Sequence, residues 1–177
     1  MRIISGRWRG RRLLGPKDAE VTRPTSDRAR EALFNLLGPR ILKGPFIDLY
    51  AGTGAVGLEA ASRGAPSVIL VENAKPALAL CRANIDKVNA SQVELRSANA
   101  SRPGPLPMAQ VAFADPPYDL PLEEAMNALL ACKLREQGCW VLERRSSEPL
   151  PALPESVAMT SDRVYGAARL LIMEKAL

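Results

Sequence analysis

The feature that most constrains the fold of this chain is an alternation of strand-like and helix-like segments between residues 46 and 143. Short apolar runs with β character are separated by stretches whose apolar residues recur with helical spacing. Such an alternation implies parallel β–α–β units with right-handed crossovers. The sequence therefore predicts an open α/β sheet, and ligands of such sheets bind outside the carboxyl ends of the strands.

The expected elements follow from the apolar runs and from the residues that interrupt them. Strands are expected at residues 46–50, 67–72, 93–97, 111–115 and 139–143. Helices are expected at residues 26–37, from the glycine-rich turn to about 63, from the N-cap Asn73 to about 88, and at 122–134. Two further runs, at 157–164 and 168–175, flank a glycine and predict a C-terminal antiparallel hairpin.

The charge of the chain is unevenly distributed. Residues 1–45 carry 11 Lys and Arg against 4 Asp and Glu, whereas residues 46–177 carry 13 against 15. The first arginines are Arg2, Arg7, Arg9, Arg11 and Arg12, with Trp8 among them. Guanidinium groups bind phosphates through paired hydrogen bonds and stack on bases, as an indole also does. The segment therefore suits contact with nucleic acid, although charge alone favours a solvated basic arm equally.

The glycines of this basic segment favour a flexible loop or a short hairpin over a helix. Trp8 has two open interpretations at this point. It can stack on a nucleic acid, or it can anchor the segment to the body of the protein.

Several kinds of site are excluded by composition. The chain contains no histidine, which excludes a Ser-His-Asp triad, a Cys-His dyad and any His-ligated metal, and no metal site is expected. Cys81, Cys132 and Cys139 form no Cys-x-x-Cys pair, which favours reduced thiols in a core. No signal peptide and no run of about 18 apolar residues occurs. A cytoplasmic protein without a membrane span is expected, with a monomer as the default state.

A glycine-rich turn follows the first strand of the alternating region. Gly52-x-Gly54-x-x-Gly57 lies between a strand and a helix, and Glu72 ends the next strand. This arrangement predicts an adenosine-containing ligand whose ribose hydroxyls are bound by the carboxylate. Asp48, four residues before Gly52, would repel the pyrophosphate of a dinucleotide. The sign of the charge favours S-adenosylmethionine, which carries an ammonium and a sulfonium and no phosphate.

A second motif follows the fourth strand. In Asp115-Pro116-Pro117-Tyr118, two successive prolines end the strand and fix the backbone. We expect them to aim the Asp115 carboxylate and the Pro116 carbonyl, both acceptors, into one pocket beside the Tyr118 ring. An exocyclic amine of a nucleobase needs two acceptors for its two N–H groups and a ring to stack on. The motif therefore predicts a site for such an amine, although on its own it also fits a rigid turn.

Together these segments resemble the RsmD family, the 16S ribosomal RNA guanine-N2 methyltransferases, within the Rossmann-like S-adenosylmethionine-dependent methyltransferases. The resemblance rests on residues 2–10, 22–35, 48–54 and 115–118. The first two segments are specific to the family, and the other two occur in many amine methyltransferases. The resemblance implies a Rossmann-like fold with a mostly parallel sheet, a basic arm and helix at 1–45 that contacts RNA and covers the cofactor, and a methyltransferase domain at 46–177.

The resemblance also implies roles for individual residues, with S-adenosylmethionine as cofactor and 16S ribosomal RNA or the small ribosomal subunit as partner. The implied cofactor-binding residues are Arg23 and Thr25 over the methionine end, Asp48, Gly52 and Gly54 along it, and Glu72 at the ribose. The implied catalytic residues are Asp115, Pro116 and Tyr118, and the implied RNA-binding residues are Arg7, Trp8, Arg9, Arg11 and Arg12. Asn99 departs from the Asp with which many relatives meet the adenine amine, so its role is less defined.

Other activities compete with this hypothesis. A DNA adenine-N6 methyltransferase shares the chemistry but usually needs a separate target-recognition domain, for which this chain has little room. A protein glutamine methyltransferase would present Asn rather than Asp before Pro-Pro-Tyr. A non-catalytic RNA-binding protein on the same scaffold would not need the intact motif at 115–118. A nicotinamide dehydrogenase is disfavoured by the charge of Asp48.

Overall fold

The structure is a computed structural model that describes residues 1–16 and 27–176, which contain seven strands and four α-helices. The strands are β1 (Phe46–Leu49), β2 (Val68–Glu72), β3 (Val93–Ser97), β4 (Ala109–Ala114), β5 (Leu134–Arg145), β6 (Val157–Tyr165) and β7 (Ala168–Lys175). The helices are α1 (Asp27–Leu37), α2 (Ala55–Ser62), α3 (Lys75–Val88) and α4 (Leu122–Leu130), with a 3-10 helix η1 (Gly38–Leu42) after α1.

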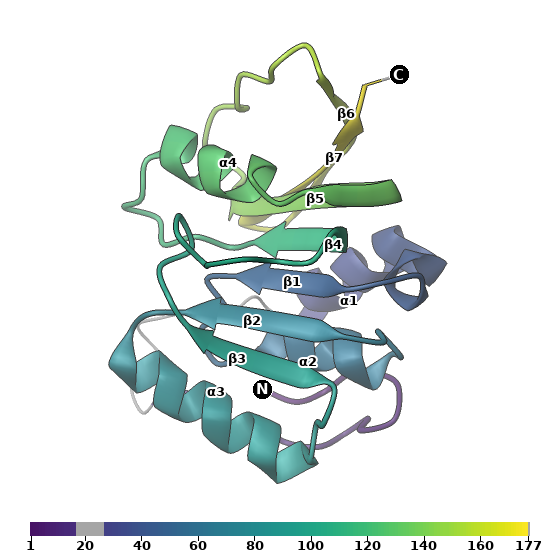
Figure 1. The fold of residues 1–177 in the computed structure, drawn as a ribbon, viewed down its shortest axis with the longest axis vertical. Coiled ribbons are helices and arrows are strands. Elements are labelled where there is room, and N and C mark those ends of the chain that lie inside the picture. The colour runs from purple at the N-terminus through teal and green to yellow at the C-terminus, as the bar shows by residue number, and fades with distance from the viewer. Residues whose placement is uncertain (17–26, 177) are drawn as a thin grey trace.

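All the described strands belong to one sheet, in the order β3-β2-β1-β4-β5-β7-β6 (Figure 1). Strands β1 to β5 are parallel, and β7 and β6 continue the sheet in antiparallel fashion. The predicted α/β fold with a mostly parallel sheet and a C-terminal antiparallel hairpin is confirmed. Among residues 1–16 and 27–176, no helix is long and apolar enough to cross a membrane.

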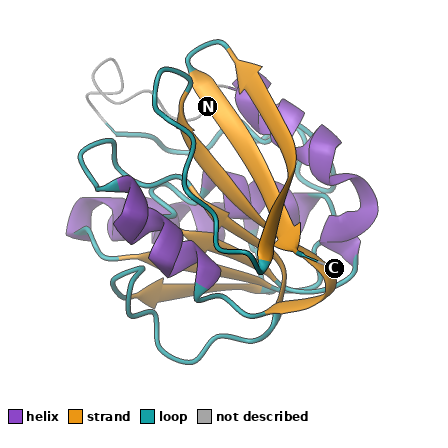
Figure 2. Ribbon diagram, turned by 90° about the horizontal axis from the view of Figure 1, so that it is seen from above, coloured by secondary structure: helices purple, strands orange, loops and turns teal. Residues whose placement is uncertain are grey.

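The sheet is covered on both faces, which explains the composition of its central strands. Every residue of β1 and β4 is buried, as expected for parallel strands between two layers of helices. Helices α1, α2 and α3 pack on one face and α4 on the other, so helices flank the sheet on both sides in Figure 2. Strands β1 to β5 end at the same edge of the sheet, here called the carboxyl edge. The opposite edge is called the amino edge.

Two boundaries differ by four or five residues from those expected from the sequence, and the others differ by two residues at most. Helix α4 ends at Leu130 rather than near residue 134, and β5 begins at Leu134 rather than at Cys139. The beginning of β5 is not recognisable as a strand because residues 135–137 are Arg-Glu-Gln and exposed, and because its pairing with β4 contains a register shift. The three cysteines are buried and free, as predicted, and burial raises the pKa of Cys132 and of Cys139 to about 11.

The basic segment at the start of the chain forms a hairpin, here called the N-terminal hairpin (residues 1–14). A β-bridge joins Arg2 to Arg12, and the tip is bound to helix α2. The backbone N–H of Trp8 donates to Ser62 Oγ at 2.9 Å, and the carboxylate of Glu59 accepts the N–H groups of Ile4 and Ser5 at 2.7 and 3.0 Å. The hairpin is therefore part of the same packed unit as the sheet.

The structure decides between the two interpretations of Trp8. Its side chain is only 4% exposed and belongs to the core cluster that includes α1 and α2. The indole therefore anchors the N-terminal hairpin and is not available to stack on RNA, so the prediction that Trp8 binds RNA is wrong. An aromatic residue among arginines fits either role in a sequence, and packing alone separates them.

Truncation of this anchor should destabilise the protein. Trp8→Ala is expected to lower the free energy of unfolding by about 3–5 kcal/mol, the usual cost of removing a large aromatic side chain from a core. Arg9→Ala, at an exposed position in the same turn, is the matched control and should change stability by less than about 0.5 kcal/mol. Urea unfolding measures both, and equal stabilities of the two variants would contradict the anchoring role.

Candidate active site

The glycine-rich turn connects β1 to α2 at the carboxyl edge. Gly52 and Gly54 have φ angles of 58° and 79°, which residues with a side chain rarely adopt. A Cβ at Gly54 would lie 2.8 Å from Cys81 Sγ, whereas a Cβ at Gly52 would have no atom within 4 Å. Gly54 is therefore required for packing, and Gly52 leaves open space where a ligand can approach the backbone.

Asp48 lies beneath this turn, on β1. Its side chain is 1% exposed, and Oδ2 accepts the N–H of Gly57 at 3.1 Å, which ties the strand to the first turn of α2. Burial raises the pKa of Asp48 well above its ordinary value, and the carboxylates of Asp115 and Glu72 raise it further, against the opposing effect of the Gly57 hydrogen bond. Three carboxyl groups thus converge at the turn, and a cationic ligand would relieve their repulsion.

Glu72 ends β2 and links the turn to the start of α3. Its Oε2 accepts the N–H of Gly52 at 2.8 Å, and its Oε1 accepts those of Asn73 and Ala74, both at 2.8 Å. The residue before α3 is Ala74, so the prediction that Asn73 caps this helix is wrong. Oε1 accepts two N–H groups and Oε2 accepts one, so the second lone pair of Oε2 can still accept one hydroxyl group of a ribose.

A cavity of about 150 Å³ opens beside Glu72 at the carboxyl edge. It is lined by Tyr50, Val71, Glu72, Asn73, Ala98, Asn99, Ala100, Pro117, Leu120 and Glu124. The Tyr50 hydroxyl is buried and has no hydrogen-bond partner among the described residues. Burial, and next the carboxylate of Glu124, raise the pKa of this phenol, so it remains a protonated donor. Apolar walls with an unpartnered hydroxyl and a carboxylate fit the adenosine part of S-adenosylmethionine.

Asn99 also reaches this cavity. Its Oδ1 accepts the N–H of Ser101 at 2.8 Å, which fixes the side chain in the turn after β3. An amide oxygen has a second lone pair, so Asn99 can accept an amine while it keeps this bond. Asn99 therefore lines the same cavity as Glu72, and its contact with the adenine amine stays a prediction.

The acceptor loop, here defined as residues 115–121, leaves β4 at the same edge. Pro116 is buried, Pro117 lines the cavity, and the Tyr118 side chain is 55% exposed. The guanidinium of Arg145 lies 3.9 Å from the centre of the Tyr118 ring, in a cation–π contact. The loop thus joins a carboxylate near the glycine-rich turn to an aromatic ring at the surface.

The structure brings together most of the residues that the sequence analysis assigned to cofactor binding and catalysis. Asp48, Glu72 and Asp115 are close enough to interact electrostatically, and Glu72 and Asn99 line one cavity. Arg23 and Thr25 lie outside the described residues. Sequence reasoning missed the buried hydroxyl of Tyr50, although its position between Asp48 and Gly52 is a signal that could have identified it.

The exposed arginines near the tip of the N-terminal hairpin do not lie beside this site, whereas the open end of the hairpin does, since Met1 Sδ lies 3.7 Å from Thr53 Oγ1 in the glycine-rich turn. Helix α2 runs from the carboxyl edge to the amino edge, and the hairpin tip is bound at its far end, where Arg7 N–H donates to the carbonyl of Ser62 at 2.8 Å. Arg11 contacts the carbonyl of Lys87, near the end of α3. An eight-residue helix is about 12 Å long, so the tip and the glycine-rich turn are at least that far apart along α2.

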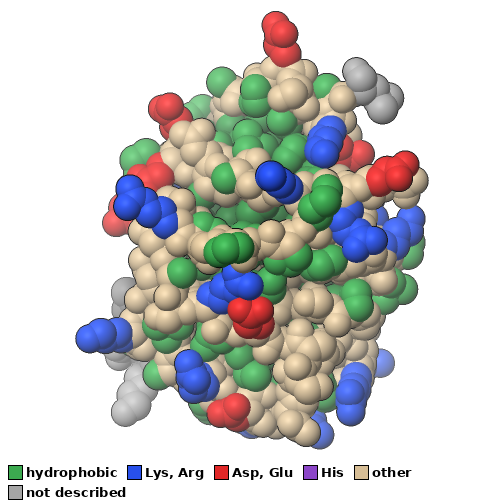
Figure 3. Space-filling model, in the orientation of Figure 1, with side chains coloured by type: hydrophobic (Ala, Val, Ile, Leu, Met, Phe, Trp, Pro, Cys, Tyr) green, Lys and Arg blue, Asp and Glu red, His purple; other side chains and the backbone are tan. Residues whose placement is uncertain are grey.

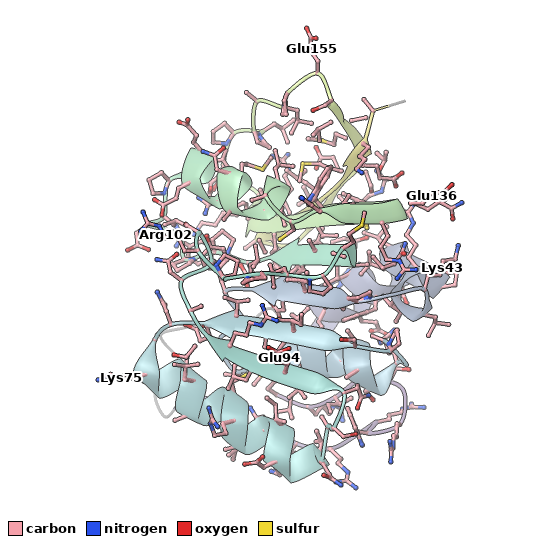
Figure 4. All side chains as sticks on the ribbon, viewed as in Figure 1. Lys43, Lys75, Glu94, Arg102, Glu136 and Glu155 are labelled. Carbon is pink, nitrogen blue, oxygen red and sulfur yellow. The ribbon has the colours of Figure 1, made fainter. Side chains whose placement is uncertain are left out.

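Other basic side chains flank the site. Lys75 and Arg102 lie at the carboxyl edge, whereas Lys43 and Glu136 lie at the amino edge (Figure 4). On the face shown in Figure 3, basic and acidic side chains are interspersed rather than gathered into one patch.

In residues 1–16 and 27–176, no group of three or more His, Cys, Asp or Glu is arranged to hold a metal ion.

Comparisons with known proteins identify the family. The family described as Conserved hypothetical protein 95 matches residues 1–174. Ribosomal RNA small subunit methyltransferase D of Escherichia coli K12 is 34% identical over 174 residues, covering 94% of this chain and 85% of that protein. The solved structure of yhhF from Escherichia coli has a TM-score of 0.85 at 30% identity and covers 99% of this chain and 97% of that chain. The structure of a hypothetical protein from Thermus thermophilus has a TM-score of 0.81 at 32% identity, with coverages of 97% and 98%. This chain belongs to the Conserved hypothetical protein 95 family, also known as the RsmD family, and has the Rossmann-like fold of methyltransferases.

Proposed function

We propose that this protein transfers a methyl group from S-adenosylmethionine to the exocyclic N2 amine of a guanine in small-subunit ribosomal RNA. The observation that carries the proposal is that Asp48 and Glu72 both bind the backbone around an open glycine-rich turn, and that Asp115 directly follows Ala114, which pairs with Leu49 beside this turn. A cluster of carboxyl groups suits a cationic cofactor, and the relative from Escherichia coli is named as a ribosomal RNA methyltransferase.

The chain's own residues have separate tasks in this reaction. S-adenosylmethionine, when bound, supplies an electrophilic methyl group on a sulfonium. Glu72 accepts a hydrogen bond from a ribose hydroxyl, and Asp48 compensates the positive charge from beneath the turn. Asp115 and the Pro116 carbonyl accept the two N–H groups of the target amine and orient its lone pair toward the methyl carbon. The released proton passes to Asp115 or to water, which explains how the site operates without histidine.

The carboxylate of Asp115 also favours guanine over adenine as the target base. Guanine presents N1–H and N2–H as adjacent donors, and a carboxylate such as Asp115 accepts both. Adenine presents an acceptor at N1, which faces a carboxylate unfavourably. Tyr118 is exposed enough to stack on a base that is unpaired or extruded from a helix. These features favour guanine as the acceptor.

The N-terminal hairpin and α1, within residues 1–45, contribute the RNA contact in this proposal, and residues 46–177 contribute the methyl transfer. Because the hairpin tip lies at the far end of α2, one RNA must extend from the amino edge to the carboxyl edge to reach both. A folded ribosomal RNA meets this requirement, whereas a nucleotide does not. The protein acts in the cytoplasm as a monomer in this proposal.

Replacement of the exposed hairpin arginines should weaken RNA binding through lost phosphate contacts. The combined variant replaces Arg7, Arg9, Arg11 and Arg12 with alanine. If all four contact phosphates, the slope of log K against log salt should decrease in magnitude by about 3. The affinity for S-adenosylhomocysteine should not change. Binding titrations between low and moderate salt measure the slope, and an unchanged slope would exclude the hairpin as an RNA contact.

The proposal is tested by cofactor binding and acceptor choice together. Calorimetry should detect S-adenosylmethionine binding by the purified protein. Labelled methyl transfer should then be measured in parallel on small ribosomal subunits, deproteinised ribosomal RNA and DNA. We expect label in ribosomal RNA, from one or both of the first two substrates, and none in DNA. Transfer to DNA alone, or no binding of the cofactor, would contradict the proposed function.

A further inference from the structure

Strand β5 extends past the end of its neighbour β4, beside the acceptor loop. Ala114 is the last residue of β4 and pairs with Leu142, whereas β5 continues for three more residues, to Arg145. The ladder cannot continue there, because the two prolines after Asp115 have no N–H to donate. The carbonyl groups of the acceptor loop therefore require hydrogen-bond donors from outside the ladder.

Arg144 supplies these donors from the overhang of β5. Its guanidinium donates to the carbonyl of Pro117 at 3.4 Å and to that of Leu120 at 3.4 and 3.5 Å. The Arg144 side chain is only 7% exposed, and its charge is balanced by Glu148, whose Oε2 accepts Nε at 2.6 Å. A planar guanidinium held by a carboxylate on one side presents its remaining N–H groups in a fixed direction.

The two carbonyls that Arg144 binds are placed on either side of Tyr118. Pro117 precedes the ring, Leu120 follows it, and the N–H of Leu120 also donates to the Pro117 carbonyl at 3.0 Å, which closes the turn. Both Pro117 and Leu120 line the cavity next to Glu72. The Arg144 contacts therefore fix the part of the chain that connects the adenosine cavity to the exposed ring.

We propose that Arg144 is a positioning residue for methyl transfer. It holds the acceptor loop at the distance from the glycine-rich turn at which Asp115 and Tyr118 meet the target amine, without touching that amine itself. This inference rests on the proposed function, because it assigns the loop to the acceptor. Since a displacement of about 1 Å can reduce a rate about 100-fold, contacts of this kind have a large effect on turnover and a small effect on substrate affinity.

The test uses Arg144→Ala and Arg144→Lys in the full chain. Arg163→Ala is the matched control, because Arg163 is an exposed arginine on β6 whose guanidinium donates to the adjacent carbonyl of Asp162. We expect kcat for methyl transfer to fall about 10- to 100-fold in Arg144→Ala, with KM for RNA changed less than about threefold. Affinity for S-adenosylhomocysteine should fall less than about fivefold. Arg144→Lys keeps the positive charge but loses the planar group of N–H donors, so its kcat should lie between those of the wild type and Arg144→Ala.

Hydrogen exchange provides a measurement that does not require activity. Amides of residues 118–124 should exchange faster in Arg144→Ala than in the wild type or Arg163→Ala. A kcat within twofold of wild type in Arg144→Ala, or in Arg144→Lys where the alanine variant does not fold, would overturn the inference. Parallel losses of cofactor affinity and kcat would also overturn it, since they indicate general damage. If the wild type binds S-adenosylmethionine but methylates no RNA, the proposed function fails, and hydrogen exchange still decides whether Arg144 holds the loop.

Discussion

Asp115→Ala is expected to reduce methyl transfer to RNA about 1,000-fold while leaving S-adenosylmethionine affinity within a few-fold of wild type. The reason is that Asp115 accepts the N–H groups of the target amine and its proton, and such contributions are typically worth about 10²- to 10⁴-fold. Cofactor binding depends instead on Glu72, the glycine-rich turn and the adjacent cavity. Single-turnover rates and calorimetry measure the two effects separately.

The acceptor loop contains its own control for this experiment. Asp119 is an exposed carboxylate four residues after Asp115 in the same loop. Asp119→Ala removes the same charge at almost the same place and should retain transfer within about threefold, since surface substitutions usually have small effects. A rate near wild type in Asp115→Ala would show that the amine is not bound by this carboxylate. Equal losses in both variants would show that net charge, rather than orientation, is responsible.

Asp48→Asn is expected to have opposite effects on stability and on cofactor affinity. Asparagine can still accept the N–H of Gly57, but it removes a buried carboxyl group that faces Glu72 and Asp115. The free energy of unfolding at neutral pH should therefore increase. Affinity for S-adenosylmethionine should fall about 10- to 100-fold, the range expected when a hydrogen-bonded charge is lost. The cofactor would no longer meet a carboxylate beneath the turn.

The pH dependence distinguishes this explanation from a change in packing. The pKa of Asp48 is raised in the folded protein, so the folded state binds more protons than the unfolded state. Stability of the wild type should therefore decrease as pH rises from the ordinary value of about 3.9 through the raised pKa, and this slope should be reduced in Asp48→Asn. Cofactor affinity of the wild type should increase over the same interval, because a cation favours the ionised carboxyl.

Cys81 is the nearby thiol in this cluster and does not interfere, because burial raises its pKa to about 12 and keeps it protonated. Chemical unfolding and calorimetry between about pH 4 and 8 measure both slopes. An identical dependence of affinity on pH in the wild type and in Asp48→Asn would contradict a role of this carboxyl in binding the cation.

The fold and much of the candidate site could be predicted from the sequence because they depend on local patterns. Continuous apolar runs predict β1, β2 and β4, which are buried on both faces, and these strands also place Glu72 at the end of β2 and Asp115 directly after β4. The glycine-rich turn was recognisable from its spacing, and its positive φ angles explain why Gly52 and Gly54 are needed.

The features that escaped prediction depend on contacts between distant residues. In the sequence, Arg144 cannot be distinguished from any other charged residue at the end of a strand. Its contact with the Pro117 carbonyl depends on the extension of β5 past the end of β4, which only the structure shows. The sequence around Trp8 fits a residue that stacks on RNA as well as it fits a core anchor, and only the burial of the side chain distinguishes the two roles. The distance between the hairpin tip and the active site depends on the length and direction of α2, because the tip binds the last residue of that helix. No motif within residues 1–14 indicates this contact.

Identification of the product nucleoside shows directly whether this site methylates the exocyclic amine of guanine. Small ribosomal subunits and their RNA, prepared from cells that lack the protein, should be incubated with S-adenosylmethionine and either the wild type or Asp115→Ala. The RNA should then be digested to nucleosides and analysed by mass spectrometry. We expect N2-methylguanosine with the wild type and background levels with Asp115→Ala. Methylation of another atom or base by the wild type, or the same product from both proteins, would contradict it.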